Sequence, residues 1–174
     1  MMKDRFGANP VPLNIPIGEG ETFKGVVDLI EMKAIMYAED DGSNFDTIDI
    51  PEDLMEKAEK WREVLLEETV SNDEVLMEKY LEGNEITIEE LKPAIRKSCI
   101  SGDIVPMLCG SAFKNKGVQS LLDYIIDFLP SPLDVGDTIG VDVDYREKEV
   151  SRTPENSSPF SALAFKIMTD PFVG

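Results

Sequence analysis

The sequence has no histidine and two cysteines, Cys99 and Cys109, among its 174 residues. Without histidine the chain cannot form a Ser-His or Cys-His nucleophile pair, a histidine general base or most of the usual zinc sites. The cysteines stand at no metal-ligand or disulfide-framework spacing, which favours a reducing compartment. We therefore expect a cytoplasmic protein with no catalytic residue and no metal ligand in this chain.

The sequence also lacks a phosphate-binding loop and a long apolar run. The motif G-x-x-x-x-G-K-[ST] needs a glycine followed by a lysine, and no glycine here is followed by lysine. No apolar run approaches the roughly 20 residues that cross a bilayer. With 42% hydrophobic residues the chain can still bury one substantial core. A globular protein that does not enter a membrane is expected.

Basic residues are scarce. The chain contains 17 of them against 35 acidic residues, and its formal net charge is −18. Fourteen acidic and four basic residues fall between residues 52 and 90. Such a segment would repel nucleic-acid phosphates, whose binding depends on lysine and arginine. We expect no direct nucleic-acid binding and favour a basic protein partner.

The segment after Pro51 shows helical periodicity on two faces. Apolar residues recur at steps of three and four, and glutamates recur at nearly the same steps two positions away. At about 100° per residue, this offset places the two sets on opposite faces of one helix. The apolar set is Leu54, Ala58, Trp61 and Leu65, and the acidic set is Glu56, Glu59, Glu63 and Glu67. The acidic face is either a solvated helix surface or a partner-binding surface.

Two shorter helices are predicted next. Residues 71–74 (SNDE) and 87–90 (TIEE) both match the S/T-x-x-E capping pattern, and Gly83 stands where the first helix would end. Pro93 would interrupt the second helix unless that helix starts near Lys92 or is kinked.

A β-hairpin is predicted before the three helices. Strand-like residues 23–37 and 45–50 flank a turn signal at residues 40–44. Apolar runs at residues 11–17 and 104–108 bracket the hairpin and helices. We expect these two runs to be neighbouring strands, because an inserted domain leaves and re-enters its host at nearby points.

Residues 109–119 lie between the second apolar run and an amphipathic helix. Small residues in such a connection let backbone amides approach a ligand closely. The helix is predicted from apolar residues at helical spacing, namely Val118, Leu121, Leu122, Ile125, Phe128 and Leu129. Taken alone, the pattern fits an ordinary strand-to-helix turn as well as a nucleotide-binding loop.

Four blocks of the sequence occur in the order residues 5–12 (RFGANPVP), residues 23–34 (FKGVVDLIEMKA), residues 110–119 (GSAFKNKGVQ) with 129–132 (LPSP), and residues 160–167 with 169–174. Together they resemble bacterial elongation factor G, a translational GTPase. The resemblance implies the C-terminal part of a P-loop GTPase α/β sheet that carries an inserted α+β subdomain, a β-hairpin with three helices. It also implies the first strand of a β-barrel domain at the C-terminus.

The resemblance divides the chain into five segments. Residues 1–18 would be a strand of the GTP-binding domain, and residues 19–102 the inserted subdomain. Residues 103–134 would end the GTP-binding domain with the guanine-recognition loop and its last helix. Residues 135–158 would be an extended linker, and residues 159–174 the start of the barrel domain.

The resemblance also assigns roles to residues. Ala112 would donate its backbone amide to the guanine carbonyl, Ser111 would order the loop, and Phe113 and Lys114 would flank it. The acidic set Glu56, Glu59, Glu63 and Glu67 would contact the C-terminal domain of the ribosomal stalk protein.

The parent protein would use GTP and Mg²⁺ to promote translocation on the ribosome. Its P-loop, switches and magnesium ligands would lie upstream of Met1, so this chain alone is expected to hold no cofactor and to be inactive. The residues fit two alternatives: a paralogous translational GTPase or ribosomal-protection protein, and a stand-alone acidic binding module.

Overall fold

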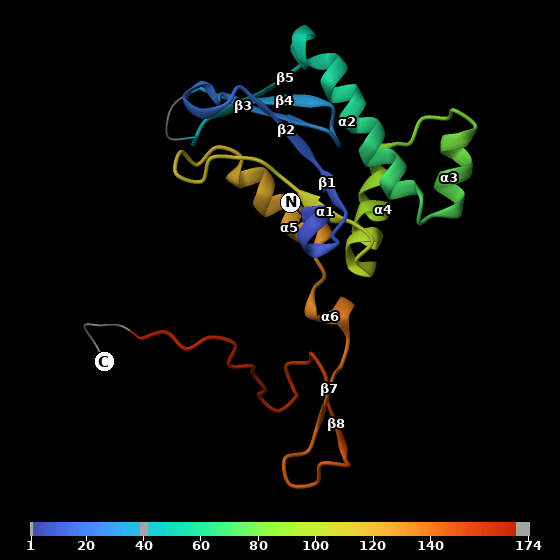
Figure 1. Cartoon of the computed structure of the whole chain (residues 1–174), viewed down its shortest axis with the longest axis vertical. Coiled ribbons are helices and arrows are strands. Elements are labelled where there is room, and N and C mark those ends of the chain that lie inside the picture. The colour runs from blue at the N-terminus through green and yellow to red at the C-terminus, as the bar shows by residue number, and fades with distance from the viewer. Residues whose placement is uncertain (1, 39–41, 170–174) are drawn as a thin grey trace. The chain divides into compact units, whose positions relative to one another are not determined.

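The computed structural model describes residues 2–38 and 42–169, which fall into two units, residues 1–130 and 131–174. Each unit contains helices and strands, so the chain has a mixed α/β structure (Figure 1). The first unit begins with the short helix α1, Met2–Phe6, and holds the buried core.

Two strands far apart in sequence form a parallel pair. Strand β1, Pro10–Pro12, lies beside β6, Val105–Met107, with Pro10 opposite Val105 and Pro12 opposite Met107. Parallel neighbours require a crossover connection, and residues 13–104 supply it. The expectation that the two apolar runs are neighbouring strands is confirmed. Their place in a larger nucleotide-binding sheet stays a prediction.

A four-stranded antiparallel sheet follows β1 directly. Its strands, in spatial order, are β2 (Asn14–Ile17), β3 (Gly25–Asp28), β4 (Lys33–Tyr37) and β5 (Phe45–Ile48). A short 3-10 helix, Gly20–Thr22, connects β2 to β3. The predicted hairpin is confirmed as β4 and β5, although residues 39–41 of its turn lie outside the described residues. Because β2 pairs with β3, this sheet crosses the segment boundary predicted at residue 18.

The stretch predicted as one strand-like run, residues 23–37, is broken by a tight turn. The carboxylate of Asp28 accepts hydrogen bonds from the amides of Ile30, at 2.8 Å, and Glu31, at 3.0 Å. Asp side chains stabilise turns in this way by replacing a backbone acceptor. Met32 completes the turn with a φ of 50°. The run therefore folds into two paired strands, β3 and β4.

Three helices follow the sheet, as predicted: α2 (Glu52–Val70), α3 (Glu74–Leu81) and α4 (Ile88–Ser101). The reciprocal capping box of Thr87 and Glu90 starts α4 at Ile88, so Pro93 lies inside this helix. The alternative start near Lys92 is wrong. The box pairs the amides of Thr87 and Glu90 and so holds the start of α4 upstream of the proline.

The cap of α3 differs from its prediction. Asp73 is the N-cap and its side chain accepts a hydrogen bond from the Leu76 amide, whereas Ser71 ends α2 by donating its amide to the Glu67 carbonyl. The longer helix α2 continues to Val70 because Val70 is fully buried. Only Asp73 is then left in the extended conformation that an N-cap needs.

The core lies between the sheet, the parallel strands and the helices. Helix α2 contributes Ala58 and Leu65, both fully buried, while Leu54 and Trp61 pack against the core from partly buried positions. The predicted apolar face of α2 is therefore confirmed. Other large, fully buried side chains are Val11, Leu13, Leu29, Ile30, Leu91, Ile95 and Phe128.

Helix α5, Val118–Phe128, is confirmed, but its burial differs from the periodic pattern. Its buried residues are Tyr124 and Phe128, whereas Leu121, Leu122 and Ile125 are 40%, 54% and 41% exposed. Tyr124 reaches the core because its hydroxyl finds a buried partner, the carboxylate of Asp28. Burial, followed by the charge of Asp28, raises the pKa of Tyr124, so the hydroxyl stays protonated and donates.

The second unit contains a small hairpin where an extended linker was predicted. Helix α6, Pro132–Val135, precedes the antiparallel strands β7, Thr138–Val141, and β8, Glu149–Arg152. The carboxylate of Asp142 accepts from the amides of Asp144 and Tyr145 in the connecting turn. Residues 159–169 contain no strand, and residues 170–174 lie outside the described residues, so the first barrel strand stays a prediction.

Replacing Tyr124 with phenylalanine should lower the free energy of unfolding of the first unit by about 1 to 3 kcal/mol, because a buried carboxylate loses one hydrogen-bond donor. Urea unfolding followed by fluorescence of Trp61, the single tryptophan, measures this. The matched control Tyr145→Phe removes the hydroxyl of a side chain that is 70% exposed and should change nothing. Equal stability of both variants would contradict a structural role for the Tyr124 hydroxyl.

Candidate functional site: a closed loop and an acidic helix face

The candidate base-recognition loop, residues 110–116, follows β6. Backbone hydrogen bonds within the loop close it. The Ser111 amide donates to the Lys116 carbonyl at 2.8 Å, and the Lys116 amide donates back to the Ser111 carbonyl at 3.0 Å. Inside this bridge, the Asn115 amide donates to the Ala112 carbonyl at 3.2 Å, and Asn115 has a φ of 52°. Residues 112–115 therefore form a tight turn at the tip. The backbone of Ser111 closes the loop, and its expected role in ordering a guanine-recognition loop stays a prediction.

Two glycines make this closure possible. A Cβ on Gly110 would lie 2.7 Å from the Lys116 carbonyl oxygen, and one on Gly117 would lie 3.1 Å from the Cys109 carbonyl oxygen. Gly117 also has a φ of 84°, which side-chain-bearing residues rarely adopt, and it starts α5. The two ends of the loop thus approach more closely than any other residue type allows.

The four predicted loop residues lie together but differ in exposure. Ser111 and Lys114 are half-buried, Ala112 is exposed, and Phe113 is fully exposed at 100%. Within residues 2–38 and 42–169, no acceptor takes the Ala112 amide. An exposed backbone donor at the tip of a closed loop can bind an acceptor atom of a ligand.

A small hollow lies against the inner side of the loop. Its volume is 160 Å³, and it is lined by Leu108, Cys109, Gly110, Ser111, Ala112, Lys116, Gly117, Val118 and Leu121. Sites that enclose a whole small ligand usually measure about 300 to 1,000 Å³. This hollow is too small for a nucleotide, although it could receive one edge of a base.

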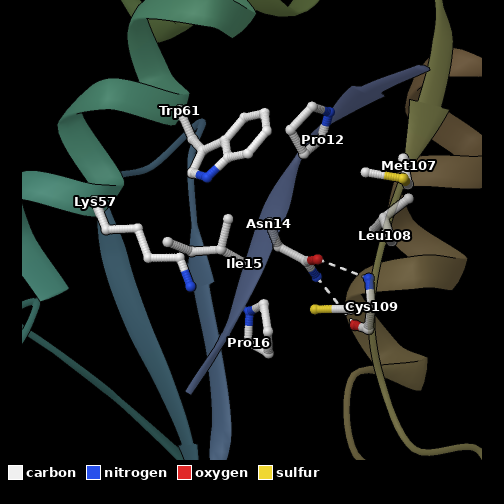
Figure 2. Close-up of a pocket in the computed structure, with 9 residues that line it drawn as sticks. All are labelled: Pro12, Asn14, Ile15, Pro16, Lys57, Trp61, Met107, Leu108 and Cys109. Carbon is white, nitrogen blue, oxygen red and sulfur yellow. Dashed lines mark hydrogen bonds between the residues drawn. The ribbon is translucent and has the colours of Figure 1, made fainter. Parts of the chain in front are cut away.

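Two side chains of the four-stranded sheet contact the ends of the loop, and sequence reasoning missed both. Asn14 on β2 bonds the backbone of Cys109, as Figure 2 shows, and the Tyr37 hydroxyl on β4 accepts a hydrogen bond from the Gly117 amide at 2.7 Å. Asn14 also lines a separate, mostly apolar pocket of 280 Å³ between β2 and α2, with Trp61 and Lys57 on its helical side. No local pattern signals these contacts, since 95 and 80 residues separate the partners.

The acidic set of α2 is exposed, as predicted. Glu56, Glu59, Glu63 and Glu67 all lie on the solvent side of the helix, opposite Ala58 and Leu65. Three of them border a shallow hollow of 510 Å³, whose lining also includes Met32, Lys60, Arg62, Leu66 and Tyr80.

The positive charge of Arg62 beside this hollow is engaged in hydrogen bonds within the fold, whereas the glutamates are exposed to solvent. The Arg62 guanidinium donates to the carbonyl oxygens of Leu29, at 2.6 Å, and Ile30, at 3.1 Å, so it is committed to the fold. Burial raises the pKa of the Tyr80 hydroxyl, and the nearby carboxylates of Glu67 and Glu63 raise it further. A cationic partner is therefore favoured on this face.

The described residues provide neither a cluster that could hold a metal ion nor a helix that could cross a membrane. Among the residues described, no group of three or more His, Cys, Asp or Glu side chains could hold a metal ion. The described helices are all too short or too polar to cross a membrane.

No protein-family model matches the chain. Among solved structures, the chain is similar to a protein of Thermus thermophilus over 81% of its own length, with 30% sequence identity and a TM-score of 0.66. The chain spans 22% of the length of that protein, whose name states no activity. The similarity supports the fold described above.

Proposed function

We propose that this chain is part of a translational GTPase similar to bacterial elongation factor G, in which it contributes to the guanine site and to a partner surface. The observation that carries this proposal is the Ala112 amide at the tip of the closed loop between β6 and α5, for which residues 2–38 and 42–169 provide no acceptor. The loop follows the carboxyl end of a parallel strand, where ligands bind in α/β folds. The match to about a fifth of a longer Thermus protein supports a place within a larger polypeptide.

The proposed chemistry is base discrimination. The O6 atom of guanine accepts a hydrogen bond from the Ala112 amide. Adenine carries an amino group at the same position, which is itself a donor and leaves the amide unpaired. Adenine therefore forms one hydrogen bond fewer than guanine with the loop. Phosphate binding, Mg²⁺ and hydrolysis are assigned to the residues upstream of Met1 in the parent protein.

The proposed partner is the C-terminal domain of the ribosomal stalk protein. The acidic set Glu56, Glu59, Glu63 and Glu67 provides an exposed, negatively charged helix face for a basic surface. The cytoplasm and the ribosome are the corresponding location and assembly. The role proposed for this chain is binding, and GTP hydrolysis is assigned to other parts of the parent protein.

Calorimetry of the 174-residue chain with GTP should detect no binding with a Kd below about 1 mM, which corresponds to roughly −4 kcal/mol. One amide at the tip of a small hollow cannot replace the missing phosphate contacts. The matched experiment uses the longer polypeptide that includes the upstream P-loop. Micromolar binding by the 174-residue chain itself would show that the proposed division of the site is wrong.

Replacing Ala112 with proline in the longer polypeptide should reduce its preference for GDP over ADP by at least about tenfold, the equivalent of 1.4 kcal/mol. Proline removes the donor, and no described residue loses a hydrogen bond with it. Ala112→Ser keeps the amide and is the control. A GDP preference that survives in the proline variant would exclude the Ala112 amide as the discriminating group.

Reversing the charge of Glu56, Glu59, Glu63 and Glu67 to lysine should weaken binding to the isolated stalk-protein domain at least tenfold at low salt. The weakening should shrink as salt rises, because exposed charges are screened. A matched control reverses Glu74, Glu78, Glu82 and Glu89, which are equally exposed on or beside α3 and α4 and change the net charge by the same amount. Equal affinities of the two variants would remove the acidic face from the interface.

A further inference from the structure

We infer that Asn14 and Tyr37 are positioning residues that hold the two ends of the base-recognition loop and thereby aim the Ala112 amide. This inference rests on the function proposed above and extends it to two side chains outside the loop. Both belong to the four-stranded sheet, Asn14 on β2 and Tyr37 on β4.

Asn14 holds the end of the loop that follows β6. The Cys109 amide donates to Asn14 Oδ1 at 2.8 Å, and Asn14 Nδ2 donates to the Cys109 carbonyl at 3.3 Å, as the dashed lines in Figure 2 show. The Asn14 side chain is 5% exposed. Only an amide offers a donor and an acceptor in this reciprocal geometry, because aspartate cannot donate when ionised and leucine offers neither.

Tyr37 holds the end of the loop that starts α5. Its hydroxyl accepts the Gly117 amide at 2.7 Å, and the residue is 6% exposed. Burial raises the pKa of the Tyr37 hydroxyl, so it remains neutral across the physiological range. The ring packs against Phe45 with a centroid distance of 5.8 Å, which fixes the direction of the hydroxyl.

A third contact keeps the sheet close to the turn at the tip. Gln119 Nε2 donates to the Gly42 carbonyl at 3.1 Å, and a Cβ on Gly42 would lie 2.4 Å from the Asn115 carbonyl oxygen. The backbone after β4 therefore touches the backbone of the loop directly. In Figure 1 the connection before α5 runs alongside the sheet, as these contacts require.

These contacts explain how a loop of small residues can discriminate between bases. Recognition by one backbone donor needs that donor to be held within about 0.5 Å of its productive position. The loop closes on itself through Ser111 and Lys116, but this closure does not fix its direction relative to β6 and α5. Asn14 and Tyr37 supply that constraint at Cys109 and Gly117, the two residues adjoining the loop.

The first experimental arm uses the 174-residue chain. Tyr37→Phe deletes one oxygen and retains the ring packed on Phe45, and Asn14→Leu is nearly isosteric and deletes both hydrogen bonds. Amide hydrogen exchange measured by NMR should accelerate at least tenfold at Gly117 in the first variant and at Cys109 in the second. Exchange in the middle of α2 should stay unchanged. Tyr145→Phe and Asn156→Leu make the same chemical changes at exposed positions and should leave loop exchange unaltered.

Exchange that stays slow at Gly117 and Cys109 would overturn the inference, as would an equal acceleration throughout the first unit. The latter result would show that the two residues stabilise the fold generally. If Asn14→Leu does not fold, Asn14→Ala, which also deletes both hydrogen bonds to Cys109, takes its place, and Tyr37→Phe with its readout at Gly117 still decides the matter.

The second arm measures GDP and ADP affinities of the longer polypeptide. Each variant should lower the GDP-to-ADP affinity ratio at least fivefold, whereas general destabilisation would weaken both nucleotides alike. A wild-type protein with no preference for GDP would overturn the proposed function and the guanine role of these residues with it. A clear wild-type preference that both variants retain would overturn the positioning role alone.

Discussion

The buried side chain of Asp28 organises the first unit, because a polar group removed from water must be hydrogen-bonded. Its two oxygens accept from the amides of Ile30 and Glu31 and from the Tyr124 hydroxyl. The first two bonds turn the chain from β3 into β4, and the third joins the sheet to α5. The position of the helix behind the candidate loop therefore depends on the same side chain that shapes the sheet.

This arrangement brings the sheet and the loop into one unit. The parallel pairing of β1 and β6 returns the chain to its starting point after the sheet and three helices, and places Cys109 within reach of Asn14. The sheet then contacts both ends of the loop, while α2 covers the core with its apolar face and presents glutamates to solvent. The proposed partner surface and the proposed base-recognition loop thus lie in the same unit and share its core.

Local rules predicted much of the secondary structure. The 3.6-residue period identified α2 and α5, the Thr87 and Glu90 pair identified the start of α4, and the turn residues near Gly42 identified the hairpin. These patterns involve residues only a few positions apart, so they can be recognised within a short segment of the sequence. Where two local signals competed, as Ser71 and Asp73 did for the cap of α3, burial of Val70 decided between them.

The sequence by itself determined the small-residue loop, the opposed faces of α2 and the absence of histidine and of a phosphate-binding motif, since each depends only on neighbouring residues or on composition. Tertiary structure alone decided that Leu121, Leu122 and Ile125 of α5 are exposed while Tyr124 is buried. It alone also joined Asn14 to Cys109 and Tyr37 to Gly117, across 95 and 80 residues. A hydrogen bond between distant residues produces no repeating pattern in the sequence, because the two groups meet only after the intervening chain has folded and packed.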